Sequence, residues 1–414
     1  MPGAITRRDV LGAAALGVAV STGTETSALA APSRSPAASG WEAIRLERPL
    51  PLGEVPTPAL LVDAAALERN LERMAAHARA KDIALRPHTK THKCPLLAKR
   101  QIEHGAIGVC TAKVSEAEVM VDAGIGEVLI TSPVVTPDKI ARVVELARRS
   151  RGVRIVVDDA AAAKRLSEAA QAADLVVGVL IDLDPGIRRT GVTPGEPALA
   201  LLREVARLGG LRFDGLQAYA GHVMHVTGWE ERRARSLAAL ERCLETKRLM
   251  ESAGFEVGIF TGGGTGTFDI DCDVDAFTDL QVGSYLFMDC GYRRVGDRDS
   301  AVFDAFEPTL FVQATAISQP AAGFITVDAG YKALATDSGV PELRDVTGVV
   351  YNWGGDEHGI LKLEAPSRAI VLGDVVTLIA PHCDPTVNLY DVLHPYRDGR
   401  VEELWPIAAR GKSQ

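Results

Sequence analysis

Leu175–Asp182 reads LVVGVLID, an unbroken run dominated by aliphatic and β-branched residues. Such a run is typical of a strand that is buried on both faces. Eight strand–helix repeats in about 230 residues would predict a (β/α)8 barrel of the TIM type, whose chemistry gathers at the C-terminal ends of the strands. An open doubly wound sheet gives a similar alternation. Seven further runs of this kind, separated by segments patterned mostly as helices, complete the eight: Ile83–Lys90, Ala106–Ala112, Glu127–Thr131, Arg154–Asp158, Phe213–Tyr219, Glu256–Thr261 and Leu280–Leu286.

The segments between the strands carry helix start and end signals. Asp63 precedes a segment with apolar residues on one face, and Thr136-Pro137 opens another. These residue types are favoured at helix N-caps and first helical positions. Gly105 and Gly254 stand where two helices are expected to end, as is typical of helix C-termini. These signals support helices between the predicted strands.

The chain changes character near residue 300, where short β-type runs follow without long helices. We therefore predict a barrel over residues 57–295 and a β-rich domain over residues 296–414, with residues 43–56 contributing an extra strand to it. The runs assigned to the second domain are Thr309–Ile317, Gly323–Asp328, Val346–Trp353, Ile360–Leu363 and Val375–Ala380.

The composition is that of an ordinary globular protein, with 47% hydrophobic and 24% charged residues. A formal net charge of −9 argues against a nucleic-acid partner, and no basic run in the sequence is strong enough to oppose that conclusion. The six cysteines are scattered without a CxxC pair, so neither a zinc ribbon nor a disulfide scaffold is predicted. A small-molecule substrate is the expected partner.

Residues 1–30 are predicted to be an export signal. Arg7-Arg8 precede an apolar run from Leu11 to Val20, and Ala28-Leu29-Ala30 offers a small-residue cleavage site. The pattern resembles a twin-arginine signal and predicts a periplasmic protein; a cytoplasmic N-terminal helix is the alternative. The apolar run is too short to span a membrane, and residues 31–42, rich in Ala, Ser and Pro, are predicted to be a linker.

A basic segment, RPHTKTHK, occupies residues 86–93 at the end of the first predicted barrel strand. A lysine in a barrel mouth can form a Schiff base with an aldehyde cofactor, whereas a solvated basic loop is the alternative. If the strand continues, Lys90 lies on one face with Arg86 and His88. We therefore expect Lys90, rather than Lys93, to be the nucleophile.

A glycine-rich segment, TGGGTGT, follows the seventh predicted strand at residues 261–267. Glycines let backbone N–H groups approach and surround an anion, and threonine hydroxyls add donors. Its place in the barrel is the usual phosphate position of this fold. The segment therefore predicts a phosphate cradle, with a flexible turn as the alternative.

Two further strand ends place polar groups at the predicted mouth. Arg189 could hold a cofactor oxygen and Tyr219 could lie near a cofactor ring, or they could be a surface ion pair and a core aromatic. His222 and His225 are each as compatible with a structural role as with that of a catalytic base. These four residues are candidates by position alone.

PHCD at residues 381–384 ends a strand of the predicted second domain. On an extended segment His382 and Asp384 project to one side and Cys383 to the other. An imidazole and a carboxylate can chelate one divalent cation and leave open positions for water and substrate. The pair therefore predicts a catalytic rather than a structural metal site.

Six motifs in this order resemble the D-threonine aldolase and D-serine dehydratase family, whose members share the alanine-racemase type of fold. The resemblance runs from Thr57 to Asp391 and is carried by RPHTKTHK (86–93), DPGIRRTG (184–191), QAYAGHVMH (217–225), GGGTGT (262–267), LQVGSYLFMD (280–289) and PHCDPTVNLYD (381–391).

The resemblance implies pyridoxal phosphate as cofactor, with Lys90 as its Schiff-base lysine. It implies that Arg189 binds the phenolic oxygen and that Tyr219 lies by the pyridine ring. It also implies a homodimer. The residues that it assigns to the phosphate are Gly263, Gly264, Thr265 and Tyr285.

The resemblance further implies that His225 assists removal of the substrate's β-hydroxyl proton and that His382 and Asp384 hold a divalent ion. Manganese is expected, with magnesium or zinc as alternatives. The dehydratase branch typically has cysteine at the position of Asp384, and a thiolate favours zinc. A carboxylate there favours the aldolase branch, although a local bulge could turn Cys383 inward.

We therefore expect a pyridoxal-phosphate- and metal-dependent D-threonine aldolase, a lyase that cleaves D-β-hydroxy-α-amino acids to glycine and an aldehyde. The nearest alternative is a dehydratase acting on D-serine or 3-hydroxyaspartate. A racemase, or a non-catalytic protein that binds pyridoxal phosphate or amino acids, fits less well because neither needs a metal beside the cofactor.

Overall fold

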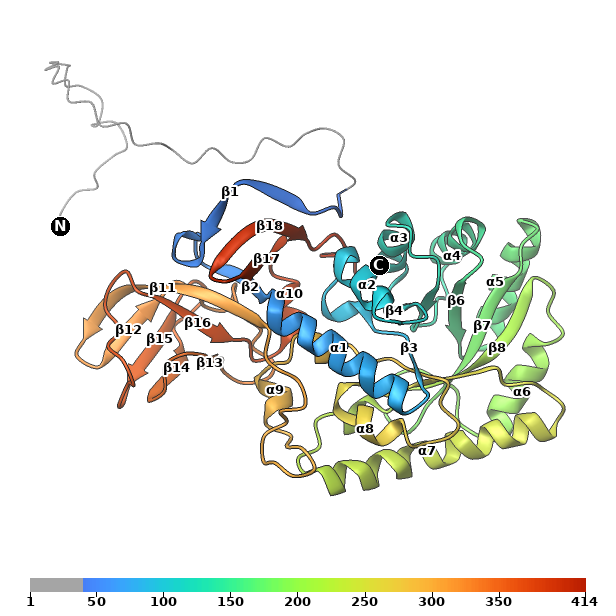
Figure 1. Ribbon diagram of the computed structural model, residues 1–414. Coiled ribbons are helices and arrows are strands. Elements are labelled where there is room, and N and C mark those ends of the chain that lie inside the picture. Colours follow the sequence, from blue (N-terminus) through green and yellow to red (C-terminus); the bar gives the residue numbers. More distant parts are fainter. Residues whose placement is uncertain (1–39) are drawn as a thin grey trace, which may run out of the picture. The chain divides into compact units, whose positions relative to one another are not determined.

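The computed structural model describes residues 40–414 (Figure 1). The predicted signal and most of the predicted linker therefore lie outside the described residues. No helix in the described part of the chain is both long and apolar enough to cross a membrane.

Eight parallel strands form one sheet in the order β3-β10-β9-β8-β7-β6-β5-β4. An isolated parallel bridge between His88 and Cys110 joins the two ends of this order, with the Cys110 amide donating to the Pro87 carbonyl at 2.8 Å. The predicted barrel is thus confirmed. Its strands are β3 (Ala84–Leu85), β4 (Val109–Thr111), β5 (Val128–Ile130), β6 (Val153–Val157), β7 (Val177–Leu183), β8 (Leu211–Ala218), β9 (Ile259–Gly262) and β10 (Asp279–Leu280).

All eight barrel strands fall within or across the predicted runs, but two are much shorter than predicted. β3 stops before Pro87, which has no N–H to donate, and the chain then turns through η2 (Thr89–Thr91). β10 likewise gives way to η5 (Ser284–Leu286). The prediction that Lys90 continues a strand is therefore wrong, because Lys90 lies within a 3-10 turn.

Helices lie between the strands as predicted. The Asp63 carboxylate caps α1 by accepting the Ala66 amide at 3.0 Å, and Pro137 is the first residue of α4. The helices are α1 (Ala64–Ala80), α2 (Pro95–Glu103), α3 (Val114–Asp122), α4 (Pro137–Arg149), α5 (Ala160–Ala172), α6 (Glu196–Val205), α7 (Trp229–Ser252), α8 (Phe268–Asp271), α9 (Cys290–Arg293) and α10 (Cys383–Val387), with further 3-10 turns η1 (Leu52–Glu54), η3 (Gly221–Val223) and η4 (Thr265–Thr267).

A second, ten-stranded sheet is built from both ends of the described chain. In Figure 1 the blue strand β1 lies beside the red strand β18, and the two pair antiparallel. The extra strand expected from residues 43–56 is β1. The strands are β1 (Ile44–Pro51), β2 (Ala59–Asp63), β11 (Leu310–Ala321), β12 (Phe324–Val327), β13 (Glu342–Leu343), β14 (Val349–Trp353), β15 (Gly359–Leu363), β16 (Val375–Ile379), β17 (Val392–Arg397) and β18 (Arg400–Pro406).

Strand β2 belongs to this second sheet, between β17 and β11. Its residues fall within the range 57–295 that we predicted for the barrel, where no strand was predicted before Ile83. Its residues are almost wholly buried, and the chain enters the barrel only at α1. The chain crosses from the second sheet to the barrel at Asp63 and returns to the second sheet at β11.

Candidate active site

A cavity of about 230 Å³ opens at the C-terminal ends of the barrel strands. This is the edge at which barrel enzymes carry their chemistry. Its wall combines a lysine, an arginine, hydroxyls, amides and glycines; the lining residues are His88, Lys90, Thr91, Ala112, Thr131, Ser132, Arg189, Thr190, Gln217, Tyr219, Gly264, Thr265, Gln281, Gly283, Ser284 and Tyr292.

Lys90 pairs across the domain boundary with Asp384, the Nζ–Oδ2 distance being 3.2 Å. The η2 turn presents the lysine, and His88 Nδ1 accepts the Lys90 amide at 3.3 Å. The nearby carboxylate raises the pKa of Lys90 above its usual range. Burial opposes ionisation of Asp384, but Lys90 and His382 outweigh it and lower its pKa to about 2. A ligand that takes the lysine must therefore break an ion pair.

The glycine-rich turn after β9 leaves no room for a side chain at Gly264 or Gly266. A Cβ on Gly264 would lie 2.9 Å from Met224 Sδ, and one on Gly266 would lie 2.1 Å from the Met224 carbonyl oxygen. Thr265 Oγ1 accepts the Tyr285 amide at 2.9 Å. Gly264 and Thr265 line the cavity, so bare backbone and a hydroxyl face a ligand there. This fits an anion such as a phosphate.

A chain of buried amides borders the cavity. Gln217 Nε2 donates to the Thr131 carbonyl at 3.2 Å and to Asp182 Oδ1 at 2.8 Å, which leaves its Oε1 to accept from Gln281 Nε2 at 3.1 Å. Burial raises the pKa of Asp182 to about 6. The Thr131 atom in this bond is a carbonyl oxygen, which can only accept a hydrogen bond. The nitrogen of the Gln217 amide must therefore face it, and this fixes the orientation of the amide.

The second hydrogen of Gln281 Nε2 is also used, since it donates to Thr261 Oγ1 at 3.2 Å. Thr261 in turn donates to Asp279 Oδ1 at 2.6 Å, and Arg86 pairs with that carboxylate at 3.3 Å. Because both Nε2 hydrogens of Gln281 are used within the protein, only its side-chain carbonyl oxygen is available to a ligand. The cavity therefore has an acceptor at this point, matched to an N–H donor such as a protonated ring nitrogen.

Arg189 and Tyr219 line the cavity together, with the guanidinium carbon 5.4 Å from the ring centroid. This distance is within cation–π range. The pair follows β7 and β8, as the motifs predicted. An aromatic face beside a fixed positive charge suits a flat, anionic ligand.

His225 follows β8 and lies exposed against Tyr292, at a ring-centroid distance of 4.4 Å. Desolvation by the surrounding protein lowers the pKa of His225, so the neutral imidazole prevails at neutral pH. Tyr292 is itself part of the cavity wall. His222 is exposed in the η3 turn.

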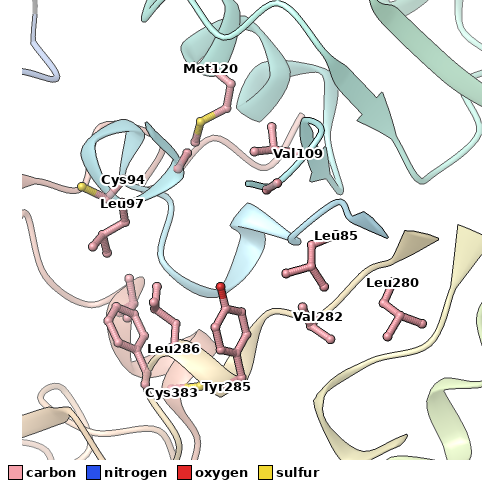
Figure 2. Close-up of a cluster of buried hydrophobic side chains, with 14 of the residues drawn as sticks. Leu85, Cys94, Leu97, Val109, Met120, Leu280, Val282, Tyr285, Leu286 and Cys383 are labelled. Atoms are coloured by element: carbon pink, nitrogen blue, oxygen red, sulfur yellow. The ribbon is translucent and has the colours of Figure 1, made fainter. Parts of the chain in front are cut away.

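Tyr285 lies in the η5 turn and does not line the cavity, unlike Ser284 of the same turn. Its ring is buried, and its hydroxyl accepts a hydrogen bond from Gln101 Nε2 at 3.1 Å. Figure 2 shows it within a cluster of apolar side chains that includes Leu286 and Cys383. Gly263, with a φ of +65°, belongs to the glycine-rich turn after β9 and does not line the cavity either. Gly283 and Ser284 line the cavity at this turn instead.

His382 and Asp384 do not lie on an extended segment, so that part of the prediction is wrong. His382 is the residue before α10, and Asp384 lies in its first turn. His382 Nδ1 bonds Asp337 Oδ2 at 2.7 Å. Among residues 40–414, no group of three or more His, Cys, Asp and Glu side chains is arranged to hold a metal. Cys383 is buried.

Several residues that line the cavity were not predicted from the sequence. Gln217 and Gln281 are polar residues inside otherwise apolar strand runs, and that mismatch was a usable signal. Thr131 and Ser132 follow β5, and Tyr292 lies in α9. The last three had no distinguishing pattern.

The residues present fit pyridoxal phosphate: an amine for its aldehyde, a glycine turn without room for a Cβ, and an acceptor for its ring nitrogen. Barrel, second β domain and strand-end lysine together define the alanine-racemase type of protein. The model for the alanine racemase N-terminal domain matches residues 62–290, and that for a putative serine dehydratase domain matches residues 309–396.

The chain belongs to the D-threonine aldolase family. It is 41% identical to D-threonine aldolase of Arthrobacter sp over 367 residues, covering 88% of this chain and 95% of that one. It is 36% identical to 3-hydroxy-D-aspartate aldolase of Paracoccus denitrificans (strain Pd 1222), covering 87% and 93%. The crystal structure of D-threonine aldolase from Filomicrobium marinum matches with a TM-score of 0.85 at 42% identity, over 90% and 100% of the two chains. The expected family and fold are confirmed, and membership supports pyridoxal phosphate as the cofactor.

Proposed function

We propose that this protein is a pyridoxal-phosphate-dependent D-threonine aldolase that cleaves D-β-hydroxy-α-amino acids to glycine and an aldehyde. The observation that carries the proposal is the meeting of Lys90 with Asp384 at a cavity bordered by the glycine-rich turn. The 41% identity to the Arthrobacter D-threonine aldolase supports the choice of reaction.

When bound, the cofactor supplies an electron sink for the carbanion left by bond cleavage. Lys90 would hold its aldehyde. Gly264, Thr265 and Ser284 would hold the phosphate, and Arg189 the phenolic oxygen. Neutral His225 accepts the proton of the substrate β-hydroxyl, which allows the Cα–Cβ bond to break.

We further propose a divalent ion as an activator, with manganese preferred over magnesium or zinc. His382 and Asp384 would hold it, and an imidazole with a carboxylate suits such ions. The ion would supply Lewis acidity at the β-hydroxyl. To bind the ion, Asp384 would have to release the Lys90 ammonium group with which it pairs at 3.2 Å.

Product analysis tests the reaction. Cofactor-loaded protein is incubated with D-threonine, L-threonine and D-serine, with and without manganese. We expect glycine and acetaldehyde from D-threonine only, faster with manganese and suppressed by EDTA. Release of an oxo acid and ammonia would establish a dehydratase instead, and activity that is unchanged by EDTA would refute the metal.

Export and assembly are separate proposals. The paired arginines of the leader support a periplasmic location, and cell fractionation of wild type and of an Arg7→Lys, Arg8→Lys variant tests it: retention of only the variant in the cytoplasm is expected. The family resemblance supports a homodimer, and sedimentation at a monomer's mass would refute it.

A further inference from the structure

Arg232 in α7 is wholly buried, with 0% of its surface exposed. Arginine is almost never fully buried unless it is paired. Here every hydrogen-bond partner in the described chain is a backbone carbonyl: Nη1 donates to Val226 at 2.9 Å and to Val295 at 3.1 Å, and Nη2 to Gly296 at 2.9 Å. Its Nε has no partner within residues 40–414. Asp269 and Asp297 act on this cation only through space, so its hydrogen bonds hold backbone and not a carboxylate.

The three carbonyls belong to two loops that come together at the cavity mouth. Val226 directly follows His225, and Val295 accepts the Gly228 amide at 2.8 Å and donates to the Tyr292 carbonyl at 3.1 Å. One guanidinium therefore ties the loop that carries His225 to the segment that carries Tyr292. These are the two residues whose rings pack at 4.4 Å.

The same loop is supported on its other side by the glycine-rich turn. Gly266 packs directly on the Met224 carbonyl, and Thr267 Oγ1 contacts Met224 Sδ at 3.6 Å. The loop thus lies between the proposed phosphate turn and Arg232. Its position has little freedom while both supports are present.

We propose that Arg232 is a positioning residue that sets His225 relative to Tyr292 and thereby the proton-accepting geometry of the site. The inference rests on the proposed function for the role of His225. Arginine suits the task because its planar fork reaches several carbonyls in fixed directions, whereas lysine offers a single point charge.

The first test measures the loops themselves and does not depend on the reaction. Hydrogen exchange of the segments 221–228 and 293–297 is compared among wild type, Arg232→Lys, Arg232→Met and the control Arg235→Ala. Arg235 lies exposed on the same helix and, within residues 40–414, its one ion pair is with Glu231. We expect exchange at least about tenfold faster in both segments for Arg232→Met, less for Arg232→Lys, and no change for the control. Unchanged protection in Arg232→Met would overturn the proposal.

The second test asks whether Arg232 acts through His225. Misplacement of a catalytic group by about 1 Å can cost roughly 100-fold in rate, so Arg232→Lys should lower kcat for D-threonine by about 10- to 100-fold with KM nearly unchanged. In a His225→Ala background the same change should have little further effect. Equal losses in both backgrounds would show a general structural role and refute the positioning role. Full activity of His225→Ala alone would instead refute His225 as the proposed base. The hydrogen-exchange measurement would still test whether Arg232 holds the two loops.

Discussion

Replacing Gly266 by alanine should damage the site without touching a polar side chain. The new Cβ would lie 2.1 Å from the Met224 carbonyl oxygen and 2.9 Å from its carbon, whereas real Cβ atoms do not approach closer than 3.0 Å. The loop must therefore move by at least 0.9 Å. The clashing atoms are backbone, so no side-chain rotation can relieve the contact.

The expected cost has two parts. Overpacking of this kind destabilises a fold by about 1–3 kcal/mol. A loop displacement near 1 Å beside the reacting atoms should lower turnover by about 10- to 100-fold. The assay compares kcat, pyridoxal-phosphate affinity and Tm of Gly266→Ala with those of Gly53→Ala, since a Cβ on Gly53 meets nothing within 4 Å. If Gly266→Ala binds cofactor and turns over like Gly53→Ala, the close packing of the two loops is not what shapes the site.

Further expectations concern single side chains. Lys90→Ala should lose both turnover and the visible absorbance of the bound cofactor; retained absorbance would assign the lysine's role elsewhere. Gln281→Leu should weaken cofactor binding by about 10-fold or more, because it removes an acceptor and leaves Gln217 Oε1 unpaired at a cost of roughly 1–3 kcal/mol. Titration of the apoprotein with pyridoxal phosphate measures the affinity, and an unchanged affinity would exclude Gln281 as a ligand group. The carboxyl of Asp182 has a pKa raised to about 6 from 3.8, so it destabilises the folded state above pH 6 and this cost fades as the pH falls toward 4. Denaturant unfolding of Asp182→Asn should therefore show a stability difference from wild type that is more favourable to the variant at pH 8 than at pH 4.5, by about 2 kcal/mol; a difference that does not change with pH would contradict the assignment.

The barrel could be predicted because its strands are apolar runs with a clear rhythm, and burial of β7 on both faces leaves a visible trace in the sequence. β17 and β18 were missed for the opposite reason. Their residues alternate between buried and exposed, and charged residues such as Glu402 and Arg397 hide the pattern. β2 was not predicted as a strand and its residues were placed in the barrel, since pairing partners distant in sequence decide the sheet to which a short strand belongs.

The residues of the site likewise divide into those that could be predicted from the sequence and those that could not. Lys90, Arg189 and Tyr219 stand in distinctive motifs at strand ends, and the structure places all three on one cavity. Tyr285 shares such a motif, yet its side chain turns toward Gln101 because η5 rotates it into the core. The ion pair of Lys90 with Asp384 depends on how two domains dock, and no local pattern encodes that.

The second sheet has a consequence for the order in which the protein can be made. β1 and β2 are synthesised before the barrel. One neighbour of β2 is β17, and the strand that pairs with β1 is β18, both in the last part of the described chain. Domains fold as units during synthesis, N-terminal parts first. Here the first strands must wait for the last, with their edges open to other partners. Asp384 also follows Lys90 by almost 300 residues, so a nascent chain carries Lys90 without its counter-charge until α10 has been made.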